Sequence, residues 1–284
     1  MNMTGKNILL YLILGIVSLS FLKCTQQNVS KGKLYIIGGG KRPDAMVKQI
    51  INLANLKEKG YLVVLPMASE EPDSAAYYAT KQFTERGISN TLSIIFQKGD
   101  TIKQWWIDTL KNASLIYISG GDQKKFMDIV GDTPIQEAIV YAYHNGAVIA
   151  GTSAGAAVMS KLMITGRQLK FPDDERYGHI VSKNIEIADG LGLVKNIIVD
   201  QHFVKRERLN RLIAVSIENP DYLCAGIDES TALLISGDSA TVCGKGQVVL
   251  VDASKSKLNS SDSLLGAKGL KIDVLLPGER FKLP

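Results

Sequence analysis

Ser153 lies in the stretch "AGTSAGAAV" at 150–158, with a glycine two residues before it and another two residues after it. Two interpretations fit this pattern. The serine belongs either to an ordinary strand-to-helix turn or to a nucleophile elbow, a tight turn that lifts a reactive hydroxyl off the end of a strand. Small neighbours favour the elbow because they leave room for the turn and for a substrate. The G-x-S-x-G pattern alone does not separate the two interpretations.

A nucleophilic serine needs a base, and the chain holds three histidines. His202 ends the apolar run "NIIVDQHF" and is flanked by Asp200 and Gln201, which makes it a strand-end residue and the candidate base. His144 comes late in an amphipathic segment, where a histidine favours the helix dipole, so we interpret it as structural. His179 follows the polar stretch "FPDDERYG" and is expected at the surface.

The residue that orients the base is expected to be an acid. Glu229, in "CAGIDES", comes just after another apolar strand, and Asp228 beside it is its rival. An α/β-hydrolase would place the acid between the serine and the histidine. Acids that could take this place, at 173–175, lie in a loop-like stretch and not at a strand end, so the α/β-hydrolase interpretation is the weaker one.

The elements around these residues alternate in type. Short apolar runs at 33–40, 61–66, 91–96, 114–122 and 147–151 predict strands, and the segments 44–60, 73–87, 101–112 and 134–146 predict helices. This alternation predicts an α/β fold, with a mostly parallel sheet covered by helices on both faces and β-hairpins from about residue 237. Sites in such sheets form beyond the carboxyl ends of the strands. Both Ser153 and the run "SGGDQ" at 119–123 follow such ends, which favours the elbow.

Three motifs in this order carry a resemblance to a known family: "GTSAGAAVMS", "VDQHFVKRERLNRL" and "GIDESTALLI". From about Leu34 to about Ser236 the chain resembles the cyanophycinase family of serine peptidases, which includes the aspartyl dipeptidase peptidase E. The resemblance implies a fold like that of class I glutamine amidotransferases, with serine in place of cysteine at the elbow. It also implies that Ser153 is the nucleophile, His202 the general base and Glu229 the residue that orients it.

The same resemblance implies a substrate. Cyanophycin is a polyaspartate chain carrying arginine on each side-chain carboxylate, and the family cuts it to β-Asp-Arg dipeptides. Other β-aspartyl or isoaspartyl peptides and the dipeptides of peptidase E are alternatives. A different class of alternative is a non-enzymatic surface lipoprotein that binds acidic peptides, although such a binder would not need all three of Ser153, His202 and Glu229.

Three arginines match arginines of the family: Arg206, Arg208 and Arg211. We expect them on an exposed helix start, over 204–219, where guanidinium groups bind free carboxylates bidentately; the alternative is a solvated helix face.

The run "GGDQ" at 120–123 also matches the family. The backbone of Gly121 and the N–H of Ala154 are expected to form an oxyanion hole. The further residues expected to contact substrate are Asp122, Gln123, Asp200 and Gln201.

The first residues are predicted to be an export signal. Lys6 precedes the run "ILLYLILGIV", which has signal-peptide length and is too short to span a membrane. Cys24 then resembles the lipidated cysteine of bacterial lipoproteins. Phe21 and Lys23 depart from that pattern, so an ordinary signal peptide and an uncleaved anchor are the alternatives. The expected localisation is therefore exported, as a membrane-anchored lipoprotein or a periplasmic or extracellular protein.

Composition bounds the remaining possibilities. Residues 1–23 are predicted to be the signal peptide, 24–32 a polar tether and 33–284 a single catalytic domain. The formal charge of +5 falls to +3 without residues 1–23, which hold two lysines and no acid, and no basic run interleaved with aromatics indicates nucleic acid. No cysteine or histidine pair has metal-ligand spacing, so neither a metal nor a cofactor is expected.

Cys224 and Cys243 are either buried thiols or a disulfide. The expected partners are a peptide or cyanophycin-like polymer, a membrane only through the N-terminal anchor, and a second copy in a homodimer.

Overall fold

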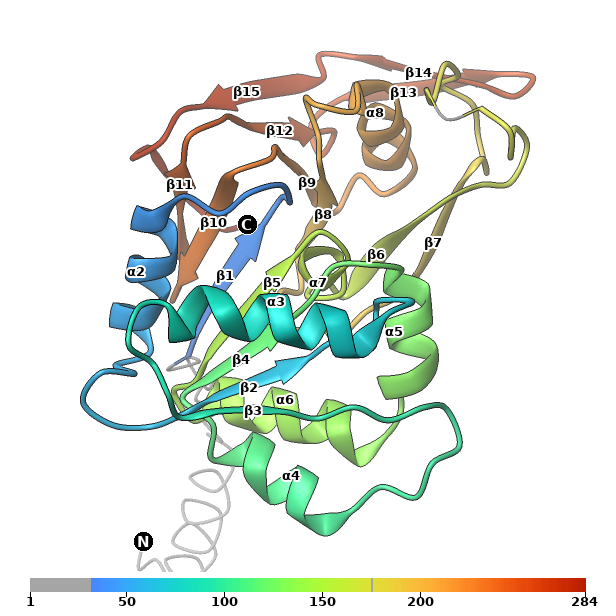
Figure 1. The fold of residues 1–284 in the computed structure, drawn as a ribbon. Helices are drawn as coiled ribbons and strands as arrows, with labels where there is room; N and C mark the ends of the chain where they lie inside the picture. Colours follow the sequence, from blue (N-terminus) through green and yellow to red (C-terminus); the bar gives the residue numbers. More distant parts are fainter. Residues whose placement is uncertain (1–31, 175) are drawn as a thin grey trace, which may run out of the picture.

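The structure is a computed structural model that describes residues 32–174 and 176–284 (Figure 1). The predicted signal peptide and Cys24 lie outside the described residues. The largest sheet has eight strands in the order β16-β11-β10-β1-β5-β4-β2-β3. Strands β1 to β5 of this sheet run parallel, and β10, β11 and β16 continue it in antiparallel pairing. The strands are β1 (Lys33–Ile37), β2 (Leu62–Leu65), β3 (Thr91–Ser93), β4 (Leu115–Ile118), β5 (Val148–Thr152), β10 (Thr231–Ser236), β11 (Ser239–Gly244) and β16 (Arg280–Lys282).

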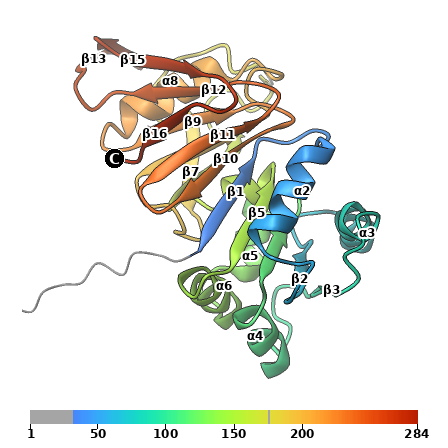
Figure 2. The same cartoon turned by 90° about the vertical axis from the view of Figure 1, so that its left-hand side faces the viewer.

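Helices cover both faces of this sheet (Figure 2). The first two helices pack with one hydrophobic cluster, and the next three pack with the other. Since both faces are covered, the central strands have no solvent-facing side and are apolar throughout. The predicted α/β fold with a large, mostly parallel sheet is confirmed. The helices are α2 (Asp44–Leu53), α3 (Pro72–Thr84), α4 (Gln104–Lys111), α5 (Gln123–Val130) and α6 (Pro134–His144); α5 was not predicted.

A second sheet of four strands has the order β15-β12-β9-β8. Its strands are β8 (Ile197–Gln201), β9 (Leu223–Ile227), β12 (Val248–Asp252) and β15 (Lys271–Leu275), and α8 (Leu209–Glu218) packs against them. Two further antiparallel pairs lie near this sheet: β6 (Leu162–Gln168) with β7 (Ile185–Asp189), and β13 (Lys257–Ser261) with β14 (Leu264–Lys268). Strands β8 and β9 are parallel and in register at their ends, where Gln201 pairs with Ile227. The residues that follow these two strands are therefore neighbours.

Three segments consequently meet at the carboxyl end of β1. Strand β1 pairs with β5, whose end leads into the short helix α7 (Ala154–Ala157). Residue Gly38, directly after β1, accepts a hydrogen bond from the segment that follows β8. In the part of the chain that the structure describes, no helix is both long enough and apolar enough to cross a membrane.

Candidate active site

Ser153 sits between β5 and α7 with backbone angles of φ 54° and ψ −110°. A positive φ is strained for a residue with a side chain, and such strain persists only where the surroundings fix it. Here the Ser153 N–H donates to the carbonyl of Ile37 at 3.0 Å. The glycine at 155 is required by close packing, since a Cβ there would lie 2.3 Å from the carbonyl oxygen of Ile118. The serine hydroxyl is thus held at the strand end, as in a nucleophile elbow.

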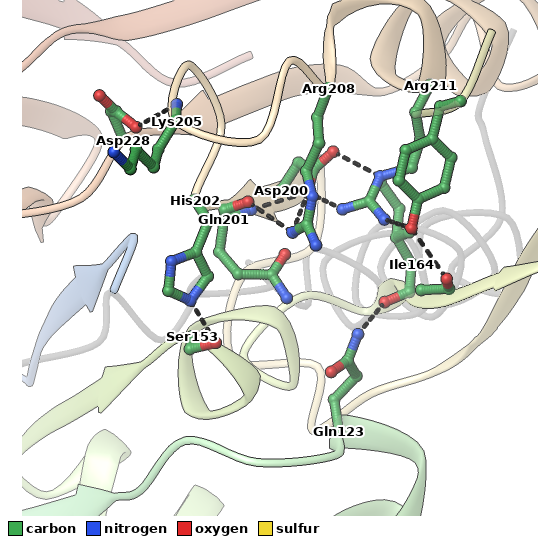
Figure 3. Close-up of polar contacts among 12 residues, drawn as sticks. Gln123, Ser153, Ile164, Asp200, Gln201, His202, Lys205, Arg208, Arg211 and Asp228 are labelled. Atoms are coloured by element: carbon green, nitrogen blue, oxygen red, sulfur yellow. Dashed lines mark hydrogen bonds and ion pairs between the residues drawn. The ribbon is translucent and has the colours of Figure 1, made fainter. Parts of the chain in front are cut away.

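The structure brings Ser153, His202 and Glu229 into one hydrogen-bonded chain. Nε2 of His202 lies 2.9 Å from Oγ of Ser153, and Nδ1 lies 2.7 Å from Oε1 of Glu229. Figure 3 shows the His202 ring turned toward Ser153. The N–H of His202 donates to the carbonyl of Gly38 at 2.7 Å. This hydrogen bond helps to hold the His202 backbone at φ 49°. Asp228, the rival acid, instead accepts from the N–H of Lys205 at 3.0 Å and so holds the turn after His202.

Three consecutive glycines, residues 38–40, form the wall behind this chain. A Cβ on Gly39 would lie 2.3–2.7 Å from the His202 ring, and Gly39 also has a φ of +124°. A Cβ on Gly40 would lie 2.8 Å from Cβ of Glu229. No side chain fits at either position. Sequence analysis did not assign these glycines a role, although a run of three glycines at the end of a strand was the available signal.

Electrostatics favour the neutral form of His202. Burial lowers the pKa of its imidazole, and Arg206 lowers it further, while the hydrogen bond to Glu229 acts in the opposite direction; the net shift is downward from the ordinary 6.5. A neutral imidazole within hydrogen-bond distance of a serine hydroxyl can accept its proton. The same ring, once protonated, is stabilised by the carboxylate of Glu229.

The loop at 120–121 lies beside the serine. A Cβ on Gly120 would be 3.4 Å from Cβ of Ser153, and Gly121 has a φ of +139°. A Cβ on Gly121 would lie 2.0 Å from the carbonyl oxygen of Ala68, so only glycine fits there. Ala154, the other residue expected in the oxyanion hole, is the first residue of α7.

Asp122 and Gln123 have structural partners. Asp122 caps α5 by accepting from the backbone N–H groups of Lys124 and Lys125 at 2.7 and 3.1 Å. The Gln123 side chain donates to the carbonyls of Ile164 and Thr165 at 2.9 and 2.7 Å, and so ties α5 to β6 (Figure 3). These bonds occupy the Asp122 Oδ1 atom and the Gln123 amide nitrogen, and contact of either residue with substrate stays a prediction.

The expectation of an exposed helix start is wrong for two of the three arginines. The turn of residues 203–208 precedes α8, which begins only at Leu209. Arg208 and Arg211 are 7% and 0% exposed, because both pair with Asp200, which is itself fully buried. Arg211 is not among the residues that line the neighbouring cavity. Of the three arginines, only Arg206 is exposed.

The buried arginines neutralise Asp200 in different ways. Arg211 holds both carboxylate oxygens and donates to the hydroxyl of Tyr177 at 2.6 Å. Burial lowers the pKa of Arg211, but Asp200 and Tyr177 together act in the opposite direction, and the net shift is upward. Burial and the neighbouring Arg211 lower the pKa of Arg208 to about 10. Arg208 also donates to the carbonyl of Gln201, whose own side-chain oxygen is buried with no partner among the described residues (Figure 3).

A cavity of about 850 Å³ opens beside these arginines. Its volume suits a peptide-sized ligand. More cationic than acidic side chains line it, which favours a ligand that carries carboxylates. The cations are Arg167, Arg176, Lys205, Arg206 and Arg208, and the acids are Asp174 and Glu207.

The other two histidines and the two cysteines take no part in the hydrogen-bonded chain of Ser153, His202 and Glu229. His144 is the last residue of α6, and the His179 ring stacks on Phe171 with 4.0 Å between ring centres. Cys224 and Cys243 are free and buried. Within residues 32–174 and 176–284, no group of three or more histidine, cysteine or acidic side chains is placed to hold a metal ion.

Comparison with known proteins places this chain among peptidases. Residues 34–243 match the model of peptidase family S51. The cyanophycinase of Nostoc sp. (strain PCC 7120) is 32% identical over 235 residues, which cover 79% of this chain and 76% of that protein. The cyanophycinase of Synechococcus elongatus is 30% identical over 273 residues, covering 92% of this chain and 82% of that protein. The crystal structure of a peptidase from an acI-B1 Actinobacterium has the same fold, with a TM-score of 0.64, 22% identity, and coverage of 90% of this chain and 99% of that one.

Proposed function

This chain belongs to peptidase family S51, and we propose that it is a serine-type peptidase with Ser153 as its nucleophile. The observation that carries the proposal is the hydrogen-bonded chain from Ser153 through His202 to Glu229, built on a serine with positive φ. Nucleophile, base and orienting acid are the three parts that activated serine hydrolysis requires.

In the proposed reaction, Oγ of Ser153 attacks the carbonyl carbon of the scissile amide while Nε2 of His202 takes the hydroxyl proton. The backbone N–H groups of Ala154 and Gly121 stabilise the oxyanion. Collapse of the tetrahedral intermediate breaks the C–N bond, and His202 returns the proton to the leaving amine. Water, deprotonated by the same imidazole, then hydrolyses the ester on Ser153 and restores the enzyme.

The proposed substrate is cyanophycin or a related β-aspartyl or isoaspartyl peptide, cut to β-Asp-Arg-type dipeptides. Two observations support it: the relatives named cyanophycinase, and a peptide-sized cavity lined by five cationic and two acidic side chains. Of the three arginines that match the family, Arg206 is the exposed one; it lines that cavity and is the proposed carboxylate ligand. Aspartyl dipeptides, as cleaved by peptidase E, are the second candidate substrate.

We extend the proposal to the architecture and location of the protein. The class I glutamine amidotransferase-like arrangement, with hairpins at the C-terminal end, is supported by the parallel sheet and by the antiparallel pairing of β10 with β11. Export with lipidation at Cys24 is tested by fractionation of a bacterial host. Cys24→Ala should move the protein out of the membrane fraction, and an unchanged distribution contradicts the lipoprotein proposal.

The experiment that tests the activity is incubation of the purified protein with cyanophycin and, separately, with β-Asp-Arg and α-aspartyl dipeptides. Release of β-Asp-Arg from the polymer by the parent protein, and none by Ser153→Ala, is the expected result. Cleavage of α-aspartyl dipeptides alone would favour the second candidate. Binding of acidic peptides with no cleavage of any of them would replace the enzyme by a binding protein.

A further inference from the structure

Ser153 lines a second cavity, of about 250 Å³. It shares no lining residue with the cavity of about 850 Å³ beside Arg206 and Arg208, which we call the arginine cavity. It lies over the carboxyl ends of β1, β4 and β5, next to α3. Its walls are the backbone of Gly39, Gly40 and Gly120, the small side chains of α3, and the ring of Tyr78. Because the nucleophile forms part of this wall, whatever enters the cavity is close to the scissile carbonyl.

Arg42 is the one charged residue among those that line this second cavity. Two neutral groups fix its guanidinium: Nη1 donates to the carbonyl of Gly40 at 2.8 Å, and Nε donates to Oε1 of Gln82 at 3.1 Å. Among the described residues no carboxylate pairs with Arg42 as an ion pair, in contrast to Arg86, Arg208 and Arg211. The positive charge is thus oriented but not neutralised.

Two hydroxyls in the same wall also have unused hydrogen-bonding capacity. Oγ1 of Thr152 and the hydroxyl of Tyr117 are buried and have no partner among the described residues. Buried polar atoms without partners are rare, and a ligand that supplies the partner is one physical reason for them. Hydroxyl groups donate readily to carboxylate oxygens, as a guanidinium does.

The geometry points to Arg42 as a second carboxylate-binding residue, which binds a substrate carboxylate on the opposite side of the scissile bond from the arginine cavity. This inference rests on the proposed function. A fixed guanidinium, two donor hydroxyls and no acidic side chain together select an anionic oxygen ligand over a cation. The substrate class is accordingly a peptide that carries a carboxylate on each side of the bond that is cut.

The test uses an oligomer of three β-Asp-Arg units and a matched oligomer in which the arginine carboxylate of the unit on the acyl side is amidated. Binding of both to the inactive Ser153→Ala protein is measured by calorimetry, with and without Arg42→Gln. The acid should bind roughly 10- to 100-fold more tightly than the amide, the range of one charge-assisted hydrogen bond. Arg42→Gln should remove that preference by weakening the acid alone, and Arg42→Lys should restore part of it.

Lys41→Gln is the matched control, because Lys41 is exposed, adjacent in sequence and absent from the cavity wall. It should leave the preference unchanged. Equal affinities of the Ser153→Ala protein for acid and amide, or an equal loss on both oligomers with Arg42→Gln, overturns the role of Arg42. That result is separable from failure of the proposed function, in which the protein with Ser153 intact binds the acid preferentially but cleaves neither oligomer.

Discussion

The triad and the arginine cluster are neighbours in the site, yet they are positioned by different interactions. Main-chain hydrogen bonds hold Ser153 and His202: their N–H groups donate to the carbonyls of Ile37 and Gly38. Side-chain ion pairs hold Arg208 and Arg211, which converge on the carboxylate of Asp200. The triad therefore depends on the path of the backbone at the end of β1, whereas the arginine cluster depends on burial of one acid. Substitutions in the two regions should fail in different ways.

The largest effect is expected in the triad. Ser153→Ala and His202→Ala should each lower kcat on the order of 10⁴- to 10⁶-fold, and the double variant should be little worse because the two side chains act as a unit. Thermal stability should change little, since main-chain bonds and not these side chains hold the region together. The measurement is hydrolysis kinetics beside a melting curve. Additive losses in the double variant would contradict activation of the serine by this histidine.

For the cluster of Arg208 and Arg211 around Asp200, we expect the main loss in stability. Arg211→Met leaves Asp200 charged, buried and paired only with Arg208 at 3.7 Å, which should cost about 3–5 kcal/mol of unfolding free energy. Adding Asp200→Asn should recover part of the loss because the unpaired charge is gone. Denaturant titration of both variants measures this. A denaturant midpoint of Arg211→Met equal to that of the parent protein would show that Arg211 is not a structural residue.

Gly39→Ala tests the backbone side of the comparison directly. The new methyl group would meet the His202 ring at 2.3–2.7 Å and displace it from Ser153. A displacement near 1 Å costs about 10²-fold in rate. Gly237→Ala is the matched control: Gly237 also has a positive φ, of +63°, but a Cβ there meets nothing within 4 Å. A similar loss of activity in both variants would assign the effect to backbone strain and not to the histidine.

The smallest effect links the two regions. His202 must be neutral to accept a proton, so kcat/KM should fall as the pH drops through its lowered pKa, below 6.5. Arg206 contributes to that lowering, so Arg206→Gln should raise the pKa and move the acid limb of the pH profile to higher pH. Arg280→Gln, on the distant strand β16, should leave the profile in place. An unmoved limb with Arg206→Gln would show that Arg206 does not influence the titration of His202.

The same comparison explains what could be predicted from the sequence. Ser153 and Glu229 follow apolar strands in the sequence, so the parallel sheet and the strand ends were accessible to pattern analysis. The burial of Arg211 was not, because "KRERLNR" has the composition of a solvated helix face. Its partner Tyr177 lies in the polar stretch that indicated a surface loop, yet Tyr177 is buried and bonded to Arg211. Arg211 is 11 residues from Asp200 and 34 from Tyr177 in the sequence, so no helix or strand period encodes either pairing.

The end of β1 has a consequence for how the enzyme loses activity. Residues 37–39 accept hydrogen bonds from Ser153, from His202 and from Ser230, the neighbour of Glu229. Strand β1 lies inside the eight-stranded sheet, between β5 and β10, and all of its residues after the first are fully buried. The N–H groups of Ser153, His202 and Ser230 that donate these hydrogen bonds should therefore exchange with solvent deuterium only when the whole sheet opens. Catalytic competence and global folding then form one cooperative equilibrium, so no partly unfolded but active state should exist, and inactivation by denaturant should coincide with loss of the sheet.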